Sequence, residues 1–125
     1  MSGKDSFLID TNIIIYLTQD VLNIHDFVKD EDELYMSSIT YMEVLGFQFQ
    51  DNSEEEKVTM FCNTFERIFL TKEIEKQTIL IRKSNKIKLP DAIIAATAIV
   101  CNLTLVTHNI DDFKHIKGLK ILNPF

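Results

Sequence analysis

The sequence predicts a single three-layer α/β/α domain, in which a mostly parallel sheet of about four to five strands lies between two layers of helices. Short apolar runs alternate with helix-like stretches along the whole chain, as in repeated strand–helix units. The first run, Phe7 to Ile9, is continuously apolar, as expected of a strand covered on both faces. A chain of 125 residues can bury a full hydrophobic core without disulfide bonds or a structural metal. No linker or repeat divides it, so residues 1–125 are expected to form one domain.

The first half of the chain predicts two strands and several helices. The first strand should pass into a short helix over residues 12–17, followed by a helical turn or two over residues 24–29. A second strand over residues 34–37 should lead into a helix that runs from Ser38 through Phe47 and carries Glu43 in its first turn. Ser53 to Glu56 has the capping-box pattern, which predicts the start of the next helix there.

The second half repeats this alternation. A short strand over residues 68–70 should be followed by a helix over residues 72–84, capped by Thr71 and burying Ile74, Thr78 and Ile81. Pro90 favours the start of a helix over residues 91–102, whose nearly all-apolar body predicts burial. A strand over residues 103–107, a loop over residues 108–113, a turn at Gly118 and a last strand over residues 119–122 should complete the domain.

Composition indicates an ordinary globular protein of the cytoplasm. The chain is 46% hydrophobic and 26% charged, and no apolar run approaches the ~20 residues that span a membrane. The first six residues are polar, so we expect no targeting segment. Cys62 and Cys101 lie in apolar stretches, which predicts buried, reduced thiols. The net charge of −6 argues against a protein that wraps nucleic acid with a broad basic face, although a local basic site remains possible.

Acidic residues recur wherever the chain returns to the carboxyl edge of the predicted sheet, where open α/β sheets bind ligands. They are Asp10 after the first strand, Glu43 on the helix after the second strand, Asp91 at a helix start, and Asp111 or Asp112 after the fourth strand. Several carboxylates in one crevice repel one another unless a divalent cation neutralises them, and all-oxygen ligands favour Mg²⁺ or Mn²⁺. Such an ion can activate water for attack on phosphorus.

Each acid also has a purely structural explanation. Asp10 could simply cap the following helix, Thr40 and Glu43 have capping-box spacing, and Asp91 suits a helix dipole. The basic run before Pro90 has two readings as well, because it could contact phosphate or could be a solvated helix end. Its cations are Arg82, Lys83, Lys86 and Lys88.

The residues around these acids resemble the PIN-domain ribonuclease family, most closely the single-domain VapC toxins of VapBC toxin–antitoxin pairs. The resemblance covers nearly the whole chain. It rests on Leu8-Ile9-Asp10-Thr11-Asn12, on Ser37-Ser38-Ile39-Thr40 leading to Glu43, on Leu89-Pro90-Asp91-Ala92, and on Leu105-Val106-Thr107-His108-Asn109 leading to Asp112-Phe113.

The resemblance implies a Mg²⁺- or Mn²⁺-dependent endoribonuclease. By this likeness Asp10, Glu43 and Asp91 are the core catalytic and metal-binding acids, and Asp112 is the fourth, with Asp111 adjacent. The supporting polar positions would be Thr11, Asn12, Ser38, Thr107 and Asn109. The likeness also implies an RNA substrate and a small VapB-like antitoxin. A homodimer is expected from it and from the apolar surface of the helix over residues 91–102.

Three rival functions remain at this point. A solitary PIN nuclease, or a PIN domain that only binds nucleic acid or protein, would share most of these residues. An unrelated phosphate-binding α/β protein would need a glycine-rich phosphate loop, but the three glycines are scattered at Gly3, Gly46 and Gly118.

Overall fold

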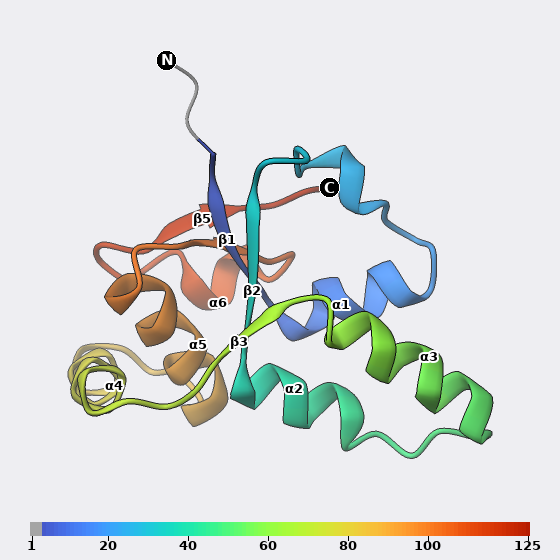
Figure 1. The fold of residues 1–125 in the computed structure, drawn as a ribbon. Helices are drawn as coiled ribbons and strands as arrows, with labels where there is room; N and C mark the ends of the chain where they lie inside the picture. The colour runs from blue at the N-terminus through green and yellow to red at the C-terminus, as the bar shows by residue number, and fades with distance from the viewer. Residues whose placement is uncertain (1–3) are drawn as a thin grey trace.

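Five parallel strands form the central sheet of the computed structural model, which describes residues 4–125 (Figure 1). The strands are β1 (Ser6–Ile9), β2 (Glu33–Ser37), β3 (Glu66–Ile68), β4 (Thr104–Val106) and β5 (Lys120–Leu122). The helices are α1 (Thr11–Thr18), the 3₁₀ turn η1 (Ile24–Asp26), α2 (Ser38–Leu45), α3 (Asn52–Cys62), α4 (Lys72–Ser84), α5 (Leu89–Val100) and α6 (Ile110–Phe113). The predicted fold class is confirmed.

The strand order β3-β2-β1-β4-β5 places β1 at the centre. The chain first builds outward from β1 through β2 to β3, then crosses over to add β4 and β5 on the other side. The order therefore reverses between β1 and β4, and a crevice opens outside the carboxyl ends of strands at such a point. Asp10, the residue after β1, lies there.

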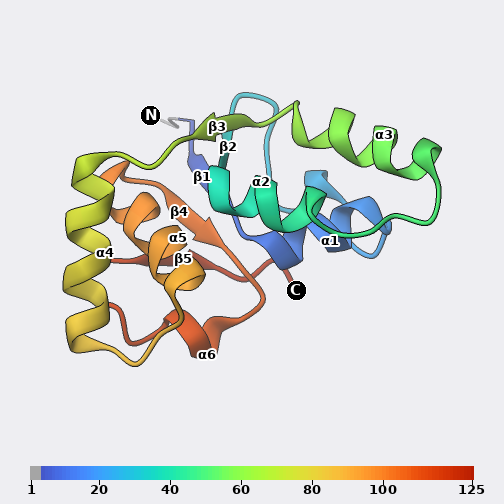
Figure 2. The ribbon, with the colours of Figure 1, turned by 90° about the horizontal axis from the view of Figure 1, so that it is seen from below.

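Two hydrophobic cores cover the two faces of the sheet. One core joins β1 and β2 to α1, α2 and α3, and the other joins β1 and β4 to α4, α5 and α6. Figure 2 shows α4, α5 and α6 gathered on one side of the molecule and α1, α2 and α3 on the other. Leu8 and Ile9 of β1 are fully buried and belong to opposite cores, because successive side chains of a strand point to opposite faces.

Helix α5 is buried as its composition predicted, but it leaves less free surface than expected. Its alanines Ala92, Ala95, Ala96 and Ala98 are essentially inaccessible to solvent. Helix α4 packs along α5, which therefore has protein on both sides. Exposed apolar side chains lie on and just before α4, at Phe69, Leu70, Ile79 and Leu80, and at the two ends of α5, at Leu89 and Val100.

Helix α2 begins at Ser38 as predicted, but its cap and its end differ from the prediction. Ser37 is the N-cap residue, and its hydroxyl accepts a hydrogen bond from the backbone N–H of Ile39. Thr40 therefore lies inside the helix and is fully buried, so it is not the N-cap residue of a capping box with Glu43. Glu43 lies in the second turn of the helix and not, as predicted, in the first turn. The helix also ends at Leu45, two residues short of the predicted extent through Phe47.

Two other boundaries moved for identifiable reasons. Asp51, not Ser53, caps α3, because its carboxylate accepts the backbone N–H of Glu54 at 2.7 Å. Strand β3 ends at Ile68 instead of beginning there, because its partner β2 ends at Ser37, which pairs with Ile68. Thr71 caps α4 as predicted, and Ile74, Thr78 and Ile81 are buried as predicted.

Three smaller predictions were wrong. The helical turn after α1 covers only Ile24–Asp26. The segment after β4, predicted as a loop, contains the short helix α6. Cys62 is buried, but Cys101 is exposed because it lies just beyond the end of α5. Gly118 has φ +82°, a conformation that suits glycine and makes the predicted turn.

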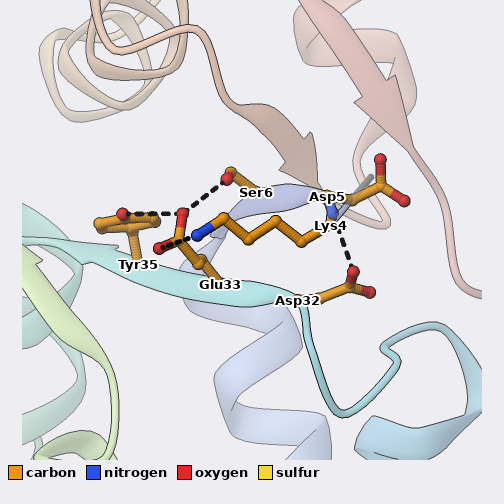
Figure 3. A network of polar contacts seen from close by, with 6 residues as sticks. All are labelled: Lys4, Asp5, Ser6, Asp32, Glu33 and Tyr35. Carbon is orange, nitrogen blue, oxygen red and sulfur yellow. Dashed lines mark hydrogen bonds and ion pairs between the residues drawn. The ribbon is translucent and has the colours of Figure 1, made fainter. Parts of the chain in front are cut away.

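The amino edge of the sheet is held by a separate polar network (Figure 3). The backbone N–H of Asp5 donates to the Asp32 carboxylate at 2.9 Å, and Glu33 accepts from the Ser6 hydroxyl and the Lys4 ammonium group. These contacts set β1 beside the start of β2.

Within residues 4–125, none of the helices has the length and apolar character needed to cross a membrane.

Candidate functional site

Asp10 is a buried carboxylate at the carboxyl edge of β1. Only 4% of the residue is exposed. Its Oδ1 accepts the backbone N–H of Thr11 at 2.8 Å, which makes Asp10 the N-cap of α1. Its Oδ2 accepts the Thr107 hydroxyl at 2.7 Å. Both carboxylate oxygens are therefore fixed, and Asp10 caps α1 while it also lies in the crevice.

Thr107 is itself held in position. It follows β4, and its Oγ1 accepts the backbone N–H of Asn109 at 3.0 Å while donating to Asp10. Asn109 thus contributes through its backbone, and its side chain makes no capping hydrogen bond to α6. This chain of bonds ties the ends of β1 and β4 together across the crevice.

The pKa of Asp10 is raised from 3.8 to about 6. Burial is the main cause, and the hydrogen bonds from Thr107 and Thr11 oppose it. The negative charges of Asp91 and Glu43 raise the pKa further, which places both acids within electrostatic reach of Asp10.

Glu43 is exposed and connected to Asp10 through Thr11. The hydroxyl of Thr11 donates to Glu43 Oε1 at 2.7 Å and lies 3.2 Å from Thr40 Oγ1. Sequence reasoning missed this role of Thr40. The available signal was that Thr40 stands four residues before the buried Val44, which puts both on the inner face of α2.

Asp91 and Asp112 approach each other from α5 and α6. Burial raises the pKa of Asp91, and the charges of Asp112 and then Glu43 raise it further, while Lys88 lowers it. Asp111 instead forms an ion pair with Lys114 at 3.0 Å, and its side chain is 91% exposed. Of the two candidates for the fourth acid, Asp112 is therefore the one whose charge acts on Asp91.

The donor set suits a hard divalent cation. The mutually repelling groups are all carboxylates, and two further buried oxygens, Asn12 Oδ1 and Ser38 Oγ, have no hydrogen-bond partner. Within residues 4–125, no three His, Cys, Asp or Glu side chains converge closely enough to hold a metal as they stand. Sharing a cation would therefore require the carboxylates to draw together.

A basic cleft of about 870 Å³ adjoins these acids. Three cations, Arg82, Lys86 and Lys88, line it together with the acids Asp91, Asp111 and Asp112, and we name it the basic cleft after the cations. Lys83, which was grouped with them from the sequence, is exposed and does not line the cleft. The last turn of α4 and the loop that follows it therefore bring three of the four predicted cations beside the acids.

A second hollow, of about 400 Å³, was not anticipated from the sequence. It lies between α1, α2 and α3 and is lined mainly by apolar side chains, including Ile15, Phe47 and Phe61, with Glu43 at its border. Phe47 is 66% exposed. This groove thus extends from the acidic crevice over the opposite helix layer.

Comparison with known families matches residues 7–119 to the PIN domain. The chain belongs to the PIN domain family. This PIN domain is 28% identical to "Ribonuclease VapC1" of Haemophilus influenzae over 126 residues, which covers 91% of this chain and 94% of that protein.

Solved structures show the same fold. A toxin–antitoxin complex from Klebsiella pneumoniae contains a chain 33% identical to this PIN domain, with a TM-score of 0.78 and coverage of 94% of this chain and 97% of that one. VapBC2 from Rickettsia felis, bound to a DNA fragment from its promoter, gives a TM-score of 0.84 at 24% identity, covering 94% and 98%. VapBC-1 from nontypeable Haemophilus influenzae gives 0.77 at 26% identity, covering 95% and 98%.

Proposed function

We propose that this PIN domain is a Mg²⁺- or Mn²⁺-dependent endoribonuclease and the toxin of a VapBC-type pair. The observation that carries the proposal is the buried Asp10 carboxylate, fixed by two hydrogen bonds and raised in pKa by Asp91 and Glu43. A fold does not keep charges in such an arrangement for stability, because burial and repulsion both oppose it. The named relatives are ribonucleases and toxin–antitoxin complexes, which favours RNA cleavage as its purpose.

In this proposal Asp10, Glu43, Asp91 and Asp112 hold the cation. Bound there, the ion would activate water and stabilise charge at the phosphodiester. Thr107 and Thr11 hold Asp10 and Glu43 in position through their hydroxyls. The unpartnered oxygens of Asn12 and Ser38 are available to the cation's water shell or to the substrate.

The basic cleft would position the RNA backbone. Arg82, Lys86 and Lys88 stand beside Asp91, so a strand whose phosphates followed them would pass the carboxylates. Because the whole chain carries a net charge of −6, this contact would be local, and binding would depend on few phosphates.

Cleavage of labelled total RNA by the purified chain tests the proposal. We expect fragments in Mg²⁺ or Mn²⁺, none in EDTA, and recovery when the metal is restored. Asp10→Asn and Asp91→Asn should each abolish cleavage with the fold intact. Full activity of either purified variant would overturn the catalytic assignment.

The partner is the second half of the proposal. A VapB-like antitoxin is expected because several solved neighbours are toxin–antitoxin complexes. The apolar groove bordered by Glu43 is where such a partner could reach the acids. A PIN nuclease that acts without an antitoxin, or a PIN domain that only binds, is the alternative. RNA binding without cleavage under every metal tested would favour the binding module.

A further inference from the structure

Three rings lie together at the carboxyl edge of the sheet and take no part in the site described above. The rings of Tyr16 and Phe125 meet edge to face with centroids 5.1 Å apart, and those of His108 and Phe125 are tilted at 4.7 Å. Tyr16 and His108 are 6.1 Å apart. We call these three residues the ring cluster. Figure 2 shows the C-terminal segment that carries Phe125 beside α1.

The outer face of the ring cluster is held open to solvent. Tyr16 is half-buried against the core on the α1 side, whereas His108 is exposed and Phe125 is 55% exposed. Asn123 accepts the backbone N–H of Phe125 at 3.2 Å and lies 3.4 Å from His108 Nδ1. The cluster is therefore a supported apolar platform rather than a loose chain end.

The ring cluster adjoins the carboxylates on the side opposite the basic cleft. His108 directly follows Thr107, whose hydroxyl donates to Asp10. Tyr16 belongs to the helix layer of α1, α2 and α3, whereas the residues that line the basic cleft belong to the layer of α4, α5 and α6. A single strand crossing the acids from the cleft would thus reach the rings next.

We propose that the ring cluster stacks on an unpaired RNA base beside the cleaved phosphate. This inference rests on the proposed nuclease function and extends it. Aromatic and imidazole rings bind splayed-out bases in this way, with little preference for sequence. A chain of net charge −6 gains from such a contact, because stacking holds RNA without adding cations.

The test distinguishes binding to the RNA bases from binding to the phosphate backbone. Fluorescence anisotropy in EDTA would compare a labelled single-stranded oligouridylate RNA with an abasic strand of the same length, which keeps phosphates but has no bases. We expect the wild type to prefer the RNA, and Phe125→Ala or His108→Ala to weaken RNA binding about tenfold. Neither variant should change binding of the abasic strand.

Matched variants complete the design. Phe125→Tyr and His108→Phe keep a ring and should retain RNA binding. Phe69→Ala removes a ring that is 64% exposed at the far edge of the sheet and should have no effect. Far-UV circular dichroism would confirm that each variant is folded.

Three outcomes would overturn the inference: no preference of the wild type for RNA over the abasic strand, an equal loss on both strands, or no loss on either. The last would assign the rings to internal packing or to a protein partner. Mg²⁺-dependent cleavage, measured separately, tests the proposed function. Base-dependent binding without cleavage would refute the nuclease alone, and cleavage with unchanged binding in the ring variants would refute stacking alone.

Discussion

At the scale of single residues, the burial of Asp10 has a thermodynamic consequence. Its pKa rise from 3.8 to about 6 corresponds to about 3 kcal/mol, at about 1.36 kcal/mol per pH unit. Because the folded state binds this proton more tightly than the unfolded state does, the metal-free protein should gain stability as pH falls through 6. The gain is complete below 3.8.

Asp10→Asn should therefore be more stable than the wild type above pH 6, by up to about 3 kcal/mol, and this advantage should disappear toward pH 4. Urea denaturation in EDTA between pH 4 and pH 8 measures the difference. If the free energy of unfolding depends on pH in the same way in both proteins, the ionised Asp10 carboxylate does not destabilise the fold as predicted.

Substitutions of the two neighbouring acids of α6 should differ in their effect on RNA cleavage. Asp112 acts electrostatically on Asp91, whereas Asp111 pairs with Lys114 in solvent. Asp112→Asn should strongly reduce Mg²⁺-dependent cleavage, and Asp111→Asn should leave it nearly unchanged. Initial rates at saturating Mg²⁺ measure this, and a larger loss in the Asp111 variant would reverse the assignment.

The sequence singled out Asp10 because it follows an apolar strand and precedes a helix, and Asp91 because it follows Pro90 at a helix start. It left Asp111 and Asp112 undecided, because the choice depends on which carboxylate the turn of α6 directs inward. The capping-box spacing of Thr40 and Glu43, one of the structural alternatives, is not used, because Ser37 is the N-cap residue of α2. Local spacing does not reveal which of several polar residues meets the free N–H groups.

At the scale of elements, the segment from α4 to α5 should contribute measurable phosphate contacts. Lys86 and Lys88 line the basic cleft, so replacing both with alanine should weaken RNA binding. The slope of log K against log salt should fall by about 1.4, or about 0.7 per phosphate contact on a single strand. Lys83→Ala, outside the cleft, is the matched control. An unchanged slope in the double variant would indicate that the basic run before Pro90 is a solvated helix end without phosphate contacts.

Element boundaries were predictable where one local signal dominates, as with Thr71 and the periodic apolar residues of α4. They were not predictable where a distant partner decides. Strand β3 ends at Ile68 because β2 ends at Ser37. The ring cluster likewise unites residues from α1, the segment after β4 and the segment after β5, and no spacing in the sequence indicates that they meet.

At the scale of the whole molecule, the exposed apolar surface on and before α4 predicts self-association. Phe69, Leu70, Ile79 and Leu80 are each more than half exposed, and exposed apolar patches mark interaction sites. We expect a homodimer in sedimentation at tens of micromolar. Ile79→Lys with Leu80→Lys should give a folded monomer if this surface forms the interface. A monomeric wild type would refute the dimer.

The apolar groove between α1, α2 and α3 predicts a second, inhibitory contact. A small antitoxin lying there would reach Glu43 at its border, and an Arg from it could replace the cation's charge through bidentate hydrogen bonds to the carboxylates. Phe47→Asp should then weaken antitoxin binding and restore RNA cleavage in a mixture of both proteins, whereas Phe69→Asp should not. Calorimetry with a small VapB-like antitoxin, followed by cleavage assays, measures both effects. Harmless expression of the wild-type chain alone in its native host would instead indicate a solitary PIN nuclease.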